Sequence, residues 1–215
     1  MATKLEVYNA VLDQIQQRPV DAVDSTQPPA TILTRQWPFA LNELLRAHPW
    51  NWAKARIELD AASPVPDFGW GNRFPLPDYF ITLLTLNQED VYDLSDYYEI
   101  EAGYLMTDED TAQIEYIRGP NDESGSEAEA DWTTDVMLTR MDPLAMAAFQ
   151  TLLAAKIAEQ VIKDGMSTSD ALYSRYYNQF LPKARHRNVT ETRQPAGYPY
   201  QRSNWLNARR QSTNG

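Results

Sequence analysis

The stretch Asp142-Pro143-Leu144-Ala-Met-Ala-Ala-Phe149-Gln-Thr-Leu152-Leu153-Ala-Ala155 carries the clearest structural signal in the chain. Aspartate followed by proline is typical of an N-cap and the first position of a helix. The helix that follows is apolar on nearly every side until Lys156, and one small bundle can hardly cover all of it. We therefore expect neighbouring subunits to pack against it, and the interface residues assigned on this basis are Leu144, Ala148, Phe149 and Leu152.

A second helical pattern follows the first. Gly165 is expected to end the first helix, and Ser167 or Ser169 is expected to cap the next one. The apolar stripe of this next helix consists of Leu172, Tyr173, Tyr176 and Phe180. Pro182 is expected to end or kink it, because proline lacks the backbone N–H that a helix interior needs.

Helical and strand patterns separate along the rest of the chain. Apolar spacing predicts a helix over residues 4–17, then a loop at Pro28-Pro29, then a helix capped by Thr34 and stopped by Pro49. Beyond it, Trp50 and Trp52 are expected on one face of an extended strand. Further strands are predicted at Phe80–Leu86, Tyr97–Glu101, Tyr104–Thr107 and Gln113–Arg118, with a hairpin turn at Ala102-Gly103.

This order of elements predicts an α+β fold, in which helices and strands are segregated. A helical bundle of two N-terminal and two C-terminal helices takes residues 1–55 and 140–185. A β-rich insertion takes residues 56–139, and an extended C-terminal arm takes residues 186–215.

Charge is distributed unevenly along the chain. The net charge is −11, yet residues 183–215 hold seven lysines and arginines against one glutamate, which leaves −17 on residues 1–182. The basic segment is either a solvated tail or an arm anchored by its aromatic residues, which a solvated tail does not need. An acidic body is the reverse of a nucleic-acid-binding footprint, so DNA binding would fall to the tail alone.

Composition excludes several kinds of site. The chain has no cysteine, which excludes disulfides and thiolate chemistry, and it has no recognisable catalytic, metal or cofactor motif. Of its two histidines, His48 is expected to pack structurally and His186 to be solvated or to contact a partner. No apolar run approaches the 18 residues of a membrane span, so a non-secreted chain without membrane contact is expected. Acidic clusters leave open a carbohydrate hydrolase using a carboxylate pair, but so many acids make that signal unspecific.

Several pieces occur in an order that resembles the podovirus tail tubular protein A family, the head-to-tail adaptors of short-tailed phages. They are Leu44-Leu-Arg-Ala-His-Pro-Trp50-Asn-Trp-Ala-Lys-Ala-Arg56, Phe74-Pro-Leu-Pro-Asp78-Tyr79, Glu101-Ala-Gly-Tyr-Leu-Met-Thr107, Ile114-Glu-Tyr-Ile117, Asp142-Pro143 before its Ala-rich helix, and Ser203-Asn-Trp205-Leu-Asn-Ala-Arg209. Together they span most of the chain. The acidic stretch 121–131 looks longer than in the family, and the first 30 residues match only as an amphipathic helix.

The resemblance implies a structural virion protein without enzymatic activity or cofactor, located in the neck of the tail and assembled in the host cytoplasm. Family members form a homo-oligomeric ring, usually of twelve subunits, and DNA passes through its lumen without specific binding. The bundle and arm grip the portal protein, for which the residues expected here are Arg185, Arg187, Arg193, Tyr198, Tyr200, Arg202, Trp205 and Arg209. The β part faces the tail nozzle (tail tubular protein B), for which the residues expected are Trp70, Asp90, Tyr92 and Asp93.

Overall fold

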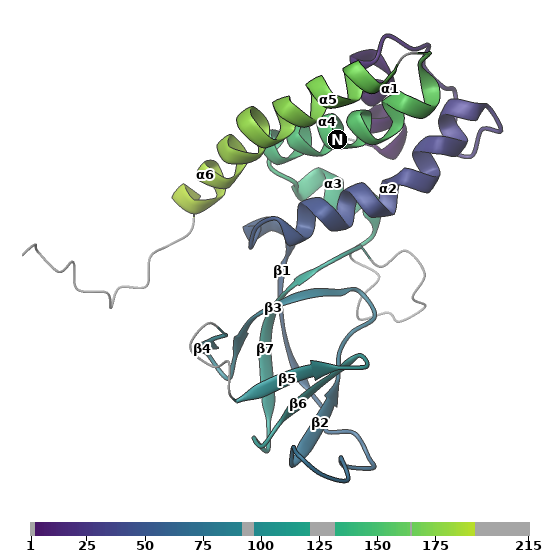
Figure 1. The fold of residues 1–215 in the computed structure, drawn as a ribbon. Helices are drawn as coiled ribbons and strands as arrows, with labels where there is room; N and C mark the ends of the chain where they lie inside the picture. Colours follow the sequence, from purple (N-terminus) through teal and green to yellow (C-terminus); the bar gives the residue numbers. More distant parts are fainter. Residues whose placement is uncertain (1–2, 92–96, 121–131, 164, 192–215) are drawn as a thin grey trace, which may run out of the picture.

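The computed structural model of the chain describes residues 3–91, 97–120, 132–163 and 165–191 (Figure 1). It has the mixed α+β fold that the sequence predicts, and its strands form two antiparallel sheets. The helical elements are α1 Lys4–Gln14, α2 Pro28–Arg46, η1 Asn51–Ala53, α3 Thr134–Arg140, α4 Pro143–Val161, α5 Gly165–Arg175, η2 Tyr176–Phe180 and α6 Leu181–Glu191. The helices gather in one layer, and the strands lie below it in the view of Figure 1.

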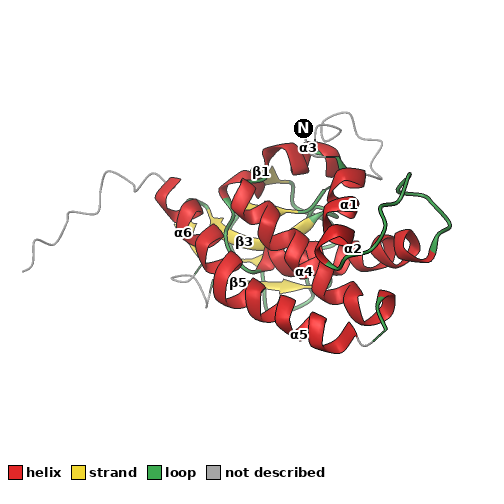
Figure 2. Cartoon of the chain, turned by 90° about the horizontal axis from the view of Figure 1, so that it is seen from above, coloured by secondary structure: helices red, strands yellow, loops and turns green. Residues whose placement is uncertain are grey.

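Helix α4 is the centre of the helical layer (Figure 2). Asp142 caps it as expected, with Oδ1 accepting hydrogen bonds from the backbone N–H groups of Leu144 (2.8 Å) and Ala145 (3.4 Å). Helices α1, α2, α5 and α6 all pack against α4, so the chain itself covers nearly every side of it. Its all-round apolar sequence therefore describes a buried central helix.

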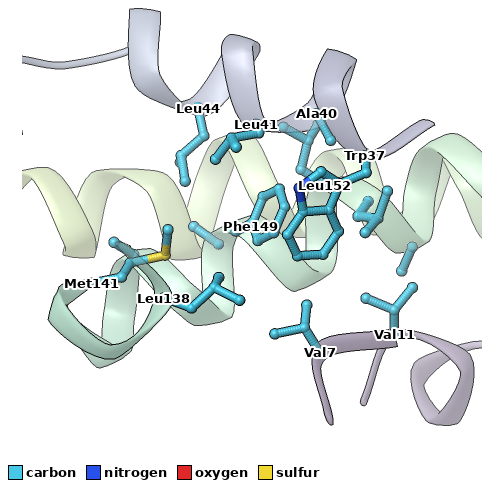
Figure 3. Packing of buried hydrophobic residues seen from close by; sticks show 14 of the residues in the cluster. Val7, Val11, Trp37, Ala40, Leu41, Leu44, Leu138, Met141, Phe149 and Leu152 are labelled. Carbon is cyan, nitrogen blue, oxygen red and sulfur yellow. The ribbon is translucent and has the colours of Figure 1, made fainter. Parts of the chain in front are cut away.

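This packing corrects most of the predicted subunit interface. Ala148, Phe149 and Leu152 are completely buried within the chain, and only Leu144 is exposed, at 37%. Phe149 meets the ring of Trp37 edge-on, with ring centroids 4.8 Å apart (Figure 3). The prediction was wrong for these three residues because it underestimated how many of the chain's own helices surround α4.

Gly165 has a different role from the one predicted. Helix α4 already ends at Val161, and Gly165 is the first residue of α5. A Cβ at this position would lie 2.2 Å from the backbone oxygen of Ala158, so only glycine permits this approach of α5 to α4. Neither predicted serine caps α5: both lie within it, and Ser169 is buried, with its Oγ donating to the backbone oxygen of Ala155 at 2.9 Å.

Pro182 does not end its helix. The backbone N–H of Leu181 donates to the carbonyl of Tyr176, five residues back, so the turn η2 is wider than an α-helical turn. A proline normally collides with the carbonyl four residues before it, here that of Asn178, and a wider turn relieves this contact. Helices α5 and α6 are therefore continuous through η2, and residues 186–191, predicted as part of an extended arm, are helical.

The two N-terminal helices begin in different ways, α1 with a side-chain cap and α2 with prolines in its first turn. Thr3 and Glu6 form a reciprocal capping box at α1, which is shorter than the predicted 4–17. Helix α2 begins at Pro28, so the predictions of a loop there and of a Thr34 cap were wrong. Prolines are tolerated in the first turn of a helix because the N–H groups of that turn have no intrahelical partner.

The strands are β1 Lys54–Leu59, β2 Asn72–Pro75, β3 Phe80–Leu86, β4 Glu89–Asp90, β5 Tyr98–Glu101, β6 Tyr104–Thr107 and β7 Ala112–Arg118. They form one sheet of order β1-β7-β3-β4 and another of order β2-β6-β5. The predicted hairpin turn is confirmed, with φ of 49° at Ala102 and 83° at Gly103. Trp50 and Trp52 do stack, at 5.9 Å between ring centroids, although the backbone there enters a 3-10 turn and is not extended.

Two hydrophobic cores correspond to the two layers. The larger one joins the helices and includes Trp132, Met137 and Leu138 from the segment around α3, a helix that the sequence reading missed. The smaller core lies between the sheets, around Phe74 and Leu105. The described residues from Trp132 onward thus pack with the helices. The boundary between the β-rich insertion and the second part of the bundle, predicted at residue 140, therefore lies earlier in the chain. Over the part of the chain that the structure describes, no helix is both long and apolar enough to cross a membrane.

Candidate interaction surfaces

The buried side chain of Asn188 fixes helix α6 to the turn between α2 and β1. Its Oδ1 accepts a hydrogen bond from the backbone N–H of Asn51 at 2.8 Å, and its Nδ2 donates to the carbonyl of Pro49 at 3.2 Å. In return, Asn51 Nδ2 donates to the backbone carbonyl of Asn188 at 3.0 Å. We call this set of contacts the Asn188 anchor. It ties the C-terminal helix to the point where the chain passes from the helices to the strands.

His48 completes the Asn188 anchor and packs structurally, as predicted. Its ring lies edge-on against Trp50, and its Nε2 is 3.0 Å from Asn188 Nδ2. Because the amide nitrogen can only donate, the contact requires a neutral His48 whose Nε2 accepts. Burial lowers the pKa of His48, and the nearby charges of Arg185 and Lys54 lower it further. The site therefore favours the neutral imidazole.

Acidification is expected to destabilise the chain through His48. The pKa of His48 is lower in the folded chain than in the unfolded chain, so the unfolded chain binds this proton first and stability falls as pH decreases from about 6.5 through the folded pKa. Urea unfolding between pH 7.5 and 5 measures this dependence, with His48→Gln as the comparison because it lacks the titrating ring. Parallel pH profiles for the two chains would contradict the assignment.

The predicted portal-binding residues are only partly within the described chain. Arg185 donates from Nη2 to the carbonyl of Ala47 at 2.7 Å, so it holds the end of α2 as part of the fold. Arg187 is exposed and pairs with Glu191 on the next helical turn at 2.8 Å. The others, from Arg193 to Arg209, lie outside the described residues.

A shallow, largely apolar groove runs between the start of α4 and α6. It is lined by Leu144, Pro182, Lys183, His186, Arg187 and Thr190. The groove thus brings the exposed residue of the predicted subunit interface beside an arginine predicted to bind the portal. His186 is exposed there, in agreement with its predicted solvated or partner-contacting role.

The predicted nozzle-facing residues do not form one surface. Trp70 is half-buried, and its indole nitrogen donates to Glu99 Oε2 at 3.1 Å, so it anchors the loop before β2. The most exposed large apolar residue of that loop is Phe68, at 89%, next to Gly69 with a φ of 88°, and Val65 is exposed at 58%. Asp90 is exposed on β4, in the other sheet, while Tyr92 and Asp93 lie outside the described residues.

No role for Phe68 was predicted from the sequence, although its proline- and glycine-rich surroundings indicate an exposed loop. It stands in a proline- and glycine-rich loop next to two acidic anchors: the N–H of Gly71 donates to Asp108 at 2.8 Å, and Asn72 Nδ2 donates to the carbonyl of Glu109 at 3.0 Å. These bonds hold the loop while Phe68 remains outside them. The loop thus presents two apolar side chains to solvent, Phe68 and Val65, and is a candidate for a protein contact.

Comparison with known proteins does not assign the chain to a family. No model of a known protein family matches the chain, and no curated protein sequence matches it at a significant level.

Proposed function

We propose that the chain is a structural virion protein, a subunit of a head-to-tail adaptor ring that joins the portal to the tail nozzle and lines the DNA exit channel. The ordered sequence pieces that resemble the tail tubular protein A family support this proposal. The observation that carries it is the separation of two candidate contact surfaces. Helix α6 belongs to the helical layer, whereas the Phe68 loop before β2 belongs to the β part below that layer (Figure 1).

In this proposal each end of the subunit binds a different partner. The segment after Glu191 carries four arginines together with Tyr198, Tyr200 and Trp205, and it binds an acidic, partly apolar face of the portal. The Phe68 loop binds the tail nozzle. The acidic body faces the lumen, where it repels DNA phosphates and lets the genome slide through without specific binding.

Ring contacts require exposed residues, and three of the four α4 residues first assigned to them, Ala148, Phe149 and Leu152, are buried. Two exposed aromatic side chains on the helical layer are Phe39, at 63%, and Tyr177, at 53%. The hydroxyl of Tyr177 donates to Glu43 Oε1 at 2.9 Å, and Glu43 lies one helical turn after Phe39 on α2. The two aromatics thus border one surface of α2 and η2, and we assign the contact between ring subunits to this surface.

Electron microscopy of the full-length chain with and without the portal of the same phage tests the proposal. We expect rings, of about twelve subunits by the family resemblance, when the portal is present. Phe39→Ser should reduce ring formation, whereas Phe68→Ser, a matched change in the β part, should leave rings intact but unable to bind the nozzle. If particles of portal and chain show no ring, the adaptor proposal is contradicted.

A carbohydrate hydrolase remains the second hypothesis from the sequence, and one groove puts it to the test. Glu58 and Glu115 both line a groove on the sheet of β1, β7 and β3. Glu115 is held by Lys54 at 3.2 Å and by Arg56 at 2.5 Å. Polysaccharide turnover that disappears in Glu58→Gln or Glu115→Gln would support this alternative over the adaptor.

A further inference from the structure

Two arginines lie against one buried tryptophan between β7 and α3. The guanidinium carbon of Arg118, the last residue of β7, is 3.9 Å from the ring centroid of Trp132, and that of Arg140, the last residue of α3, is 5.4 Å from it. Trp132 is 2% exposed, Arg118 is half-buried and Arg140 is exposed. The indole therefore holds two cations at one place, and the cluster opens to solvent on the side of Arg140.

Several donors of this cluster have no acceptor. Neither arginine forms an ion pair with any described carboxylate. Arg118 Nε and Trp132 Nε1 are both buried and have no hydrogen-bond partner among the described residues. Buried donors without acceptors cost free energy and are uncommon in folded proteins, so an acceptor from outside the described chain would stabilise this cluster.

The two cations also repel each other. Burial lowers the pKa of Arg118, and the neighbouring charge of Arg140 lowers it further, while the hydroxyl group of Tyr116 acts in the opposite direction. An anion bound by both guanidinium groups would reduce this repulsion and would supply acceptors for their N–H groups at the same time.

We propose that Arg118, Trp132 and Arg140 form a binding site for a phosphate group. The side chains offer donors only, which selects an oxyanion. A guanidinium stacked on an aromatic ring keeps the N–H groups at its edge free, and these match phosphate geometry. A phosphate has enough oxygens to accept from both arginines at once. The site does not depend on the adaptor function proposed above.

Free inorganic phosphate and the phosphodiester backbone of DNA share this chemistry. A contact with the DNA backbone would involve one small basic cluster on an acidic protein, so the affinity for DNA would be low and would decrease with salt concentration. Titration of the full-length chain with sodium phosphate at constant ionic strength tests the free anion, with sodium chloride as the blank. Titration of a fluorescently labelled DNA duplex into the same protein tests the backbone.

Arg140→Gln is the informative variant, because Arg140 is exposed and its loss leaves the core intact. We expect it to weaken phosphate binding at least tenfold. Arg73→Gln is the matched control: Arg73 also lies over an aromatic ring, that of Tyr104 at 4.8 Å, and its Nε is also buried without a partner, yet its ring holds only one arginine. This control should bind phosphate as the unmodified chain does.

The outcomes separate cleanly. Loss of duplex binding in Arg140→Gln but not in Arg73→Gln identifies a DNA phosphodiester as the ligand, and loss of inorganic phosphate binding alone identifies the free anion. Equal binding by all three chains, or no binding by any, overturns the site. Phosphate binding that appears only after the five carboxylates of residues 121–131 are replaced by amides also overturns it, because the chain's own acids would then be the anion.

Discussion

Deleting residues 192–215 is expected to abolish binding to the portal while the thermal unfolding of the chain stays unchanged. The segment carries four of the chain's arginines together with Trp205, and burying one tryptophan at an interface contributes about 4 kcal/mol, close to a thousandfold in affinity. The deletion leaves α6 and the Asn188 anchor in place. Biolayer interferometry with immobilised portal, together with calorimetry of the truncated chain, measures both effects.

A longer deletion provides the control for this experiment. Removing residues 186–215 also removes the side chain of Asn188 and with it the hydrogen bonds between Asn188 and Asn51. That variant should lose thermal stability as well as portal binding. Undiminished portal binding by the shorter deletion would show that the basic segment is not the portal contact. The groove between α4 and α6 would then be the next candidate for that contact.

Phe149→Ala is expected to cost about 3–5 kcal/mol of the free energy of unfolding. The ring is completely buried in the centre of the helical layer, and its edge-on contact with Trp37 is lost along with the apolar contacts of α4. Domains of this size have about 5–15 kcal/mol of stability in total, so the variant should unfold at much lower urea concentration. Urea unfolding followed by far-ultraviolet circular dichroism measures the change.

Leu144→Ala is the matched substitution on the same helix. Because Leu144 is 37% exposed, its truncation should change stability by only about 0.5 kcal/mol. The pair distinguishes a core role from an interface role for Phe149. If Phe149→Ala left the unfolding curve unchanged and weakened only the association of subunits, the central position of α4 would be contradicted.

The sequence predicted those elements that depend on neighbouring residues alone, such as short strands, a helix cap and a hairpin turn. The predicted bounds of β3 and β6 are those observed, and the cap at Asp142 and the turn at Ala102-Gly103 are confirmed. The predictions for Gly165 and Pro182 were wrong, because Gly165 permits the close approach of α5 to α4 and Pro182 is accommodated by a wider helical turn. A glycine that stops a helix and a glycine that admits a neighbouring helix look identical in sequence.

The candidate surfaces were less predictable than the fold. The all-round apolar character of α4 pointed either to neighbouring subunits or to the chain's own helices, and only the packing decides between them. Trp70 and Phe68 stand two residues apart in the same kind of loop, and the hydrogen bond from Trp70 to Glu99 decides which of them is presented. The Asn188 anchor joins residues 137 positions apart, a distance that no local pattern reveals.

The continuous helix from α5 to α6 makes the Asn188 anchor a mechanical link. From Gly165 to Glu191 this rod extends roughly 40 Å at 1.5 Å per residue. Its first part is bonded to α4 through Ser169, and its last part is bonded to the turn that leads into β1. Tension applied to the chain beyond Glu191 would therefore act directly on the turn between α2 and β1, where the helices pass into the strands.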